Sequence, residues 1–209
     1  MDQYNEEYFI RGKKAGVSLY ENYRWLPDLT RPMVRAIVDH LRVRPADTVL
    51  DFGCARGYTV RALREFGYKG FGVDGSHWAV QNCDDAVRAY VGHVGDPPAM
   101  SEGEFDWVVA KDVLEHVPNV LRIVGILMRA AARGVFAVVP LSLINGAPYV
   151  VGEYERDATH VHRLTLDTWA LMFLQPGWRV EMAYRIRGVK DNYAHHAKGN
   201  GFITARRID

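Results

Sequence analysis

Short apolar segments alternate with amphipathic helical patterns along most of this sequence. Strands are predicted near residues 48–50, 70–73, 87–91, 105–110 and 135–139, and apolar residues at helical spacing occupy the stretches between them. The segment 135–139 is continuously apolar, which is typical of a strand buried on both faces. The alternation of strand and helix predicts a doubly wound α/β fold with a mostly parallel sheet.

The C-terminal part of the chain changes this pattern. Residues 178–186 and 201–206 alternate like strands and are close enough in sequence to pair antiparallel at the end of the sheet. The prediction is therefore a seven-stranded sheet with helices on both faces and an antiparallel C-terminal strand. We expect the first long helix to begin at Pro32 and to end before Pro45.

Composition restricts the class of protein. Lysine and arginine number 26 and aspartate and glutamate 25, so the formal charge of +1 disfavours duplex nucleic acid as a partner. Cys54 and Cys83 cannot form a disulfide framework, and no apolar run is long enough to span a membrane. We expect a cytoplasmic protein without membrane contact, with one domain at residues 31–209 and an N-terminal extension at residues 1–30.

A glycine-rich turn, residues 51–57, follows the first predicted strand. Gly53 and Gly57 allow a ligand to approach the backbone, and a helix begins directly after the turn. In a doubly wound sheet, ligands bind beyond the carboxyl ends of the strands, where this turn lies. Asp51 would repel the pyrophosphate of a dinucleotide, which disfavours a nicotinamide-dependent oxidoreductase, but it suits a cationic amino group.

A second acidic residue, Asp74, ends the second predicted strand. Its two carboxylate oxygens can accept hydrogen bonds from both hydroxyl groups of a ribose. Because Asp51 and Asp74 follow neighbouring strands, they can hold opposite ends of one ligand. This pattern favours an adenosyl ligand with an amino-acid tail over a tight turn that binds nothing.

These motifs resemble a known family. The chain is similar to class I S-adenosylmethionine-dependent methyltransferases of the small-molecule type at residues 49–57, 72–74, 105–109, 113–117 and 157–160. The family usually has glycine where Ala55 stands. The resemblance implies S-adenosylmethionine as the cofactor and the following cofactor-binding residues: Asp51, Gly53, Cys54, Gly57, Asp74, Gly75 and Asp96. The alternative for Asp96 is a turn residue that contacts no ligand.

The resemblance also implies residues around the substrate. Lys111, Asp112 and His116 follow the fourth strand and would line the reaction cavity, with helix-start packing as the alternative for His116. The N-terminal extension would cover the cofactor site, where Tyr20 could shield the sulfonium and Arg24 could pair with a carboxylate. Packing of this aromatic segment onto the domain is the alternative.

A long connection, residues 140–164, is expected to cover the substrate. It contains Tyr154, a candidate substrate contact, and His160 and His162, which share a face if the segment is extended. A neutral imidazole accepts protons near neutral pH, so His160, His162 and His116 are the candidate catalytic residues. The alternative for the pair is solvated loop histidines. We expect no metal, because no third ligand stands at a recognisable spacing from the pair.

Together these residues predict a methyltransferase that acts on a small molecule, a sugar or a glycan. O-methylation is favoured, because a hydroxyl acceptor gains from proton removal by a histidine during attack. N-methylation of a small molecule and a non-catalytic methyltransferase-like binding subunit are the alternatives.

Overall fold

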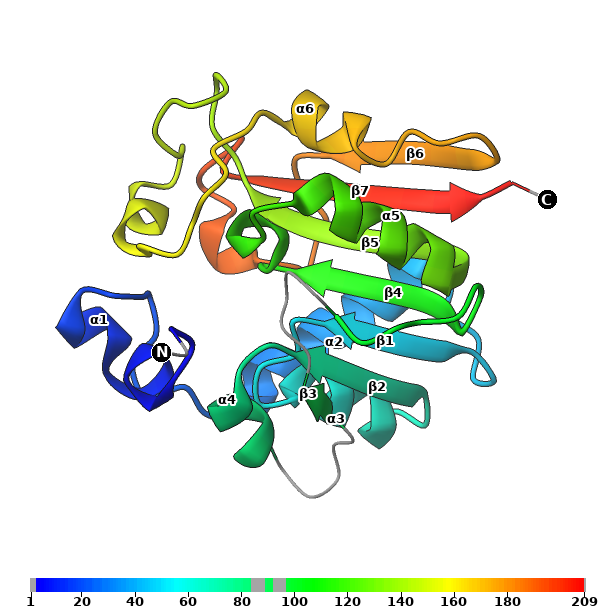
Figure 1. Cartoon of the computed structure of the whole chain (residues 1–209), viewed down its shortest axis with the longest axis horizontal. Helices are drawn as coiled ribbons and strands as arrows, with labels where there is room; N and C mark the ends of the chain where they lie inside the picture. The colour runs from blue at the N-terminus through cyan, green and yellow to red at the C-terminus, as the bar shows by residue number, and fades with distance from the viewer. Residues whose placement is uncertain (1–2, 84–88, 92–96, 209) are drawn as a thin grey trace.

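The sheet has seven strands, as the sequence predicts. The computed structural model describes residues 3–83, 89–91 and 97–208. The strands are β1 Thr48–Phe52, β2 Lys69–Asp74, β3 Ala89–Val91, β4 Phe105–Lys111, β5 Ala131–Pro140, β6 Trp178–Ala183 and β7 Asn200–Arg207. Their order is β3-β2-β1-β4-β5-β7-β6, and β7 runs antiparallel to both of its neighbours (Figure 1). The parallel pairing of β1 to β5 and the antiparallel C-terminal strand are thus confirmed.

Helices cover both faces of the sheet, which confirms the doubly wound prediction (Figure 1). α5 Val120–Ala130 and α6 Leu166–Leu171 pack on one face, and α2 Pro27–Leu41 and α3 Tyr58–Glu65 pack on the other. The shorter elements are η1 Glu7–Arg11, α1 Gly12–Ala15, α4 His77–Gln81, η2 Leu114–His116, η3 Gly152–Arg156 and η4 Asp191–Tyr193. Within the described residues, no helix combines the length and the apolar character needed to cross a membrane.

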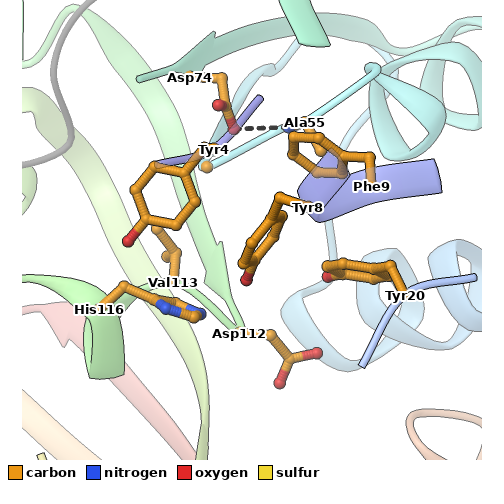
Figure 2. Close-up of a pocket in the computed structure, with 10 residues that line it drawn as sticks. Tyr4, Tyr8, Phe9, Tyr20, Ala55, Asp74, Asp112, Val113 and His116 are labelled. Carbon is orange, nitrogen blue, oxygen red and sulfur yellow. Dashed lines mark hydrogen bonds between the residues drawn. The ribbon is translucent and has the colours of Figure 1, made fainter. Parts of the chain in front are cut away.

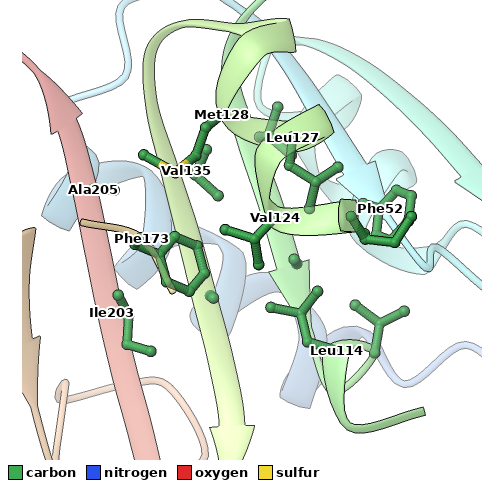
Figure 3. Packing of buried hydrophobic residues seen from close by; sticks show 14 of the residues in the cluster. Phe52, Leu114, Val124, Leu127, Met128, Val135, Phe173, Ile203 and Ala205 are labelled. Atoms are coloured by element: carbon green, nitrogen blue, oxygen red, sulfur yellow. The ribbon is translucent and has the colours of Figure 1, made fainter. Parts of the chain in front are cut away.

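The central strands contribute side chains to two cores, because successive residues of a strand point to opposite faces. Val135 of β5 packs with Leu127 of α5 on one face (Figure 3), whereas Trp107 of β4 packs against α2 on the other. β5 is buried from its fourth residue to its last, which confirms the prediction for residues 135–139. Burial of each such side chain stabilises the fold by about 1.5–3 kcal/mol. The sheet therefore holds the residues at its edge in fixed positions.

α2 begins earlier than predicted, but it ends before Pro45, as the sequence predicts. It begins at Pro27, a favoured first helical residue, and not at Pro32, which lies inside the helix. Pro32 removes one backbone hydrogen bond near the start of the helix, but burial of residues such as Val34 against the sheet outweighs this loss. Arg42 adopts a left-handed conformation (φ 58°) and caps the helix. The boundary expected between residues 30 and 31 falls inside α2.

The N-terminal segment packs against α4 at the edge where the parallel strands end (Figure 1). Tyr8 and Phe9 are buried there, and Phe9 stacks on Trp78 with ring centroids 5.5 Å apart. The backbone carbonyl of Tyr4 accepts a hydrogen bond from Ser76 Oγ. The loop between β5 and α6 lies at the same edge, so two segments distant in sequence meet over the carboxyl ends of the strands.

Candidate active site

A pocket lies at the carboxyl ends of β1, β2 and β4 (Figure 2). The turn after β1, Asp74 and the residues after β4 form its polar side. Its opposite side consists of aromatic side chains of the N-terminal segment: Tyr4, Tyr8, Phe9 and Tyr20. The space open to the centre of a water molecule is about 50 Å³, and roughly 10–15 Å³ of such space is enough for one water molecule. The rings therefore fill most of this site, which we call the aromatic-covered pocket.

The turn after β1 has a left-handed backbone at three positions. Gly53 (φ 80°), Ala55 (φ 48°) and Gly57 (φ 72°) all have positive φ. A Cβ atom at Gly53 would lie 2.5 Å from Val113 Cγ2, so both the backbone angle and the space require glycine there. Ala55 adopts the conformation for which the family uses glycine, at a cost of about 1–2 kcal/mol. Gly57 is the N-cap of α3.

Asp74 connects the turn to the end of β2. Its Oδ2 accepts a hydrogen bond from the backbone N–H of Ala55 (2.7 Å), and its Oδ1 accepts one from the N–H of Ser76 (2.8 Å) (Figure 2). The side chain is buried but lines the aromatic-covered pocket. Because each carboxylate oxygen can accept more than one hydrogen bond, these contacts leave capacity for a ligand.

Asp51 lies deeper than Asp74. It is buried at the end of β1 and, among the described residues, is not part of the wall of the aromatic-covered pocket. Burial raises the pKa of Asp51 to about 7, although the positive charge of Lys111 opposes this shift. Burial thus favours the protonated form of this carboxyl group.

A wider cavity of about 450 Å³ adjoins the aromatic-covered pocket. Tyr8, Tyr20, Asp112 and His116 line both spaces. The wider cavity is also lined by the end of β4, by η2 and η3, and by the loops that follow η3 and β6, among them Lys111, Glu115, Tyr154, Asp157, His160 and Lys190. The structure thus brings together most of the substrate-side residues that the sequence suggests.

Asp112 is the centre of a charged network. It has a positive φ of 54°, which is rare for a residue with a side chain. Lys190 Nζ donates to its Oδ1 (2.6 Å), and Lys111 Nζ donates to its Oδ2 (2.5 Å). Burial by itself would raise the pKa of Asp112, but the two ammonium groups together lower it. Lys190 also donates to the hydroxyl of Tyr154 (2.9 Å).

A compact group of titratable side chains lies beside this network. The rings of His116 and His160 are 4.6 Å apart between centroids, and His160 Nε2 is 4.0 Å from Glu115 Oε1. Burial raises the pKa of Glu115 to about 8, with a contribution from the charge of Asp112. Burial also lowers the pKa of His116 to about 4 and lowers that of His160. Both imidazoles are therefore neutral at neutral pH.

A chain of hydrogen bonds orients His116. Its Nδ1 lies 2.7 Å from Thr159 Oγ1, and Thr159 Oγ1 donates to Asp157 Oδ1 at 2.5 Å. The hydroxyl of Tyr8 donates to Asp157 Oδ2 (2.8 Å), so the N-terminal segment is joined to this chain. These contacts connect η2, the loop after η3 and the N-terminal segment.

Two predicted residues lie apart from these walls. His162 Nε2 contacts the backbone carbonyl of Val117 (2.7 Å), and its ring packs on Trp169. Arg24 is exposed. Neither is among the described residues that line the two cavities, so their catalytic and substrate-contact roles stay predictions.

Cys54, Gly75 and Asp96 are the remaining predicted cofactor-side residues. Cys54 is a buried residue of the turn, and Gly75 is a partly buried residue between Asp74 and Ser76. Asp96 lies outside the described residues. Their contacts with a cofactor stay predictions.

Sequence reasoning missed several residues of the wider cavity. Glu115 and Asp157 belong to the motifs at 113–117 and 157–160, so their neighbours His116 and His160 were a usable signal. Lys190 has no such signal, because it lies 78 residues from its partner Asp112 in a loop without a recognisable motif.

A known protein family matches most of the chain. Residues 24–182 match a family described as a methyltransferase domain. The chain belongs to this family. It is a class I S-adenosylmethionine-dependent methyltransferase in fold, and S-adenosylmethionine is its cofactor. Comparison with curated proteins gave no match.

Solved structures of low sequence identity have the same fold. A chain in the complex of the Haloferax volcanii Trm112 methyltransferase activator with a putative methyltransferase is 18% identical, with a TM-score of 0.68 over 87% of this chain and 91% of that chain. An S-adenosylmethionine-dependent methyltransferase from Mesorhizobium loti is 16% identical (TM-score 0.62, 82% and 98% covered). Phosphoethanolamine N-methyltransferase 2 from Haemonchus contortus, solved with S-adenosyl-L-methionine, is 14% identical (TM-score 0.65, 85% and 52% covered).

Proposed function

We propose that this protein is an enzyme that transfers a methyl group from S-adenosylmethionine to a hydroxyl group of a small molecule, sugar or glycan. The position of His116 carries the proposal, because this residue lines both the aromatic-covered pocket and the wider cavity. A ligand in the first space would lie directly beside a ligand in the second. Such alignment of two reactants is the main requirement of an in-line methyl transfer.

The residues of the aromatic-covered pocket fit the cofactor. Asp74 has capacity to accept the ribose hydroxyls, and the left-handed turn at Gly53 leaves space where a side chain would meet Val113. Tyr8 and Tyr20 present aromatic rings, which attract a sulfonium cation. Asp51 would attract the ammonium group. When bound, the cofactor supplies a methyl group on a positively charged sulfur.

The N-terminal extension would act as the cover of this pocket. Its rings leave a cavity of about 50 Å³, which has room for only a few water molecules. We expect the segment to move outward when the cofactor binds. Its return would exclude water from the reacting groups.

The wider cavity would hold the acceptor. The imidazoles of His116 and His160 are neutral near pH 7, so either can take the hydroxyl proton as the oxygen attacks the methyl carbon. Lys190, Asp112 and Tyr154 offer hydrogen bonds to other polar groups of the acceptor. We extend the proposal to a cytoplasmic location, whose reducing conditions suit the reduced cysteines Cys54 and Cys83.

N-methylation is the second candidate. Acidic side chains outnumber lysines in the wall of the wider cavity, which favours an acceptor with a cationic amino group. Asp28 and Asp191 add to Asp112 and Asp157 there. One neighbour in fold is, by its title, a phosphoethanolamine N-methyltransferase.

Release of S-adenosylhomocysteine tests both candidates. The protein is incubated with S-adenosylmethionine and matched panels of sugars, phenols and amines, and calorimetry measures cofactor binding on the same sample. We expect turnover with a hydroxyl acceptor, and a loss of turnover without a loss of cofactor affinity in His160→Ala. Turnover with amines alone would support N-methylation instead of O-methylation. Cofactor binding without turnover on any panel would favour a non-catalytic binding subunit.

A further inference from the structure

Three side chains at the wall of the wider cavity have the composition of a metal site. Glu115 and His116 lie on η2, and His160 lies on the loop after η3. One donor atom of each lies within 4.8 Å of the donor atoms of the other two. A transition-metal ion with bonds of about 2.1 Å holds its ligands about 3–3.5 Å apart, so small side-chain rotations would complete the coordination.

Two of these side chains carry buried polar atoms that no described residue satisfies. Within the part of the chain that the structure describes, Glu115 Oε2 and His160 Nδ1 have no hydrogen-bond partner. Glu115 is 2% exposed and His160 8% exposed. Leaving such atoms unpaired destabilises the folded state, so their convergence requires an explanation other than packing.

The third side chain is held in the tautomer that a metal ion needs. The carboxylate of Asp157 can only accept, so the hydroxyl of Thr159 donates to it and must accept from His116 Nδ1–H. Nε2 of His116 then has a free lone pair. A histidine whose second ring nitrogen is fixed by a hydrogen bond, with a carboxylate behind it, is the usual outer arrangement of a metal ligand.

We propose that Glu115, His116 and His160 bind one divalent transition-metal cation at the wall of the wider cavity. Two imidazoles and one carboxylate favour Zn²⁺ or a similar ion over Mg²⁺, which prefers oxygen ligands. Three protein ligands leave further coordination positions for an acceptor, because all three side chains line the wider cavity. The sequence predicts no metal site, because the pair His160 and His162 has no third ligand at a recognisable spacing. The fold instead places His160 beside Glu115 and His116, which are distant in sequence.

The role of the ion, unlike its binding, rests on the proposed function. With the ion bound, His116 and His160 would act as ligands rather than as bases. The cation lowers the pKa of a hydroxyl group that reaches it, so the acceptor proton would pass to solvent. The oxygen lone pair then forms the bond to the methyl carbon, and the electrons of the carbon–sulfur bond remain on sulfur. The products are a methyl ether and S-adenosylhomocysteine.

Direct metal binding by the full chain tests the site. The protein is stripped with a chelator and titrated with Zn²⁺ and separately with Mg²⁺ by calorimetry, and Co²⁺ is used as an optical probe. We expect one Zn²⁺ per chain and weaker Mg²⁺ binding. Glu115→Gln and His160→Gln should each weaken Zn²⁺ binding at least about tenfold, and Thr159→Val should weaken it by up to about tenfold through His116.

A matched control addresses adventitious binding. His195 and His196 have rings 4.2 Å apart outside the candidate site and form an alternative zinc-binding pair. The double variant His195→Gln/His196→Gln should retain the high-affinity Zn²⁺ site. Unchanged Zn²⁺ affinity in both Glu115→Gln and His160→Gln, or loss of the site in the control, overturns the proposal, as does the absence of stoichiometric Zn²⁺ binding.

Cofactor titration of the same samples separates the two proposals. Failure of S-adenosylmethionine to bind would contradict the proposed function, whereas failure of Zn²⁺ to bind with the cofactor site intact would contradict only the metal site. Circular dichroism of each variant verifies that it is folded. The conservative Thr159→Ser, which keeps the hydroxyl, should restore the affinity that Thr159→Val loses.

Discussion

At the scale of single residues, buried acids at the carboxyl edge of the sheet combine structural and binding roles. Asp74 accepts hydrogen bonds from two backbone N–H groups, and Asp112 is enclosed by two lysines. Burial of Asp51 raises the pKa of its carboxyl group to about 7. Substitution of these residues therefore changes both stability and ligand binding, and the two effects need separate measurements.

Asp74→Asn should weaken S-adenosylmethionine binding at least about tenfold, because one carboxylate oxygen becomes an amide that cannot accept from the ribose or from Ala55 N–H. Unfolding free energy should fall by about 1–3 kcal/mol. Asp47→Asn is the matched control, because Asp47 is also buried but lies before β1, at the opposite edge of the sheet. Calorimetry showing equal loss of affinity in both variants would contradict the ribose role.

Because the pKa of Asp51 is raised in the folded state, we expect the free energy of unfolding to depend on pH. Its folded pKa of about 7 exceeds its unfolded value of 3.8, so the folded state binds the proton more tightly. The stabilising contribution is complete below about pH 4 and is lost as pH rises to about 7, a change of roughly 4 kcal/mol. Asp51→Asn should remove this part of the slope. Urea unfolding between pH 4 and 8 measures the free energy of unfolding of both proteins. The same pH dependence in the wild type and in Asp51→Asn would refute the raised pKa of Asp51.

At the scale of elements, the turn between β1 and α3 is the most restricted segment of the site. Its left-handed residues place the backbone against Val113, so the turn and the segment after β4 constrain each other. The loop between β5 and α6 contributes in a different way. It carries Tyr154, Asp157 and His160 to the same edge and is held there by side-chain contacts with the N-terminal segment and η2.

Gly53→Ala should lower the unfolding free energy by about 2–4 kcal/mol, because a Cβ atom combines a positive φ with a 2.5 Å approach to Val113. Gly146→Ala is the control for the backbone angle alone. Gly146 has φ 83° with open space around it, so about 1–2 kcal/mol is expected there. Chemical denaturation measures both, and equal losses would show that contact with Val113 adds nothing.

At the scale of the whole molecule, the chain is a sheet with helices on both faces and two covering segments at one edge (Figure 1). The N-terminal segment reaches α4 by the stacking of Phe9 on Trp78 and reaches the β5–α6 loop by the hydrogen bond from Tyr8 to Asp157. Opening of the aromatic-covered pocket must therefore disturb both contacts.

Trp78 should report this opening. We expect tryptophan fluorescence to change saturably as S-adenosylmethionine is added, because displacement of Phe9 alters the surroundings of the indole. Trp78→Phe should remove most of the change while keeping a stacked ring and a binding affinity within about threefold. An unaltered signal in Trp78→Phe would place the movement elsewhere in the chain.

The sequence by itself determined the order of the elements, the antiparallel end of the sheet, the glycine turn and the acids at the ends of β1 and β2. These features depend on local periodicity and on residues adjacent in the chain. Tertiary structure decided that Lys190 neutralises Asp112 and that His160 meets Glu115 and His116, while His162 packs on Trp169. Those contacts depend on where long loops cross the edge of the sheet, and that path is set by packing between distant segments.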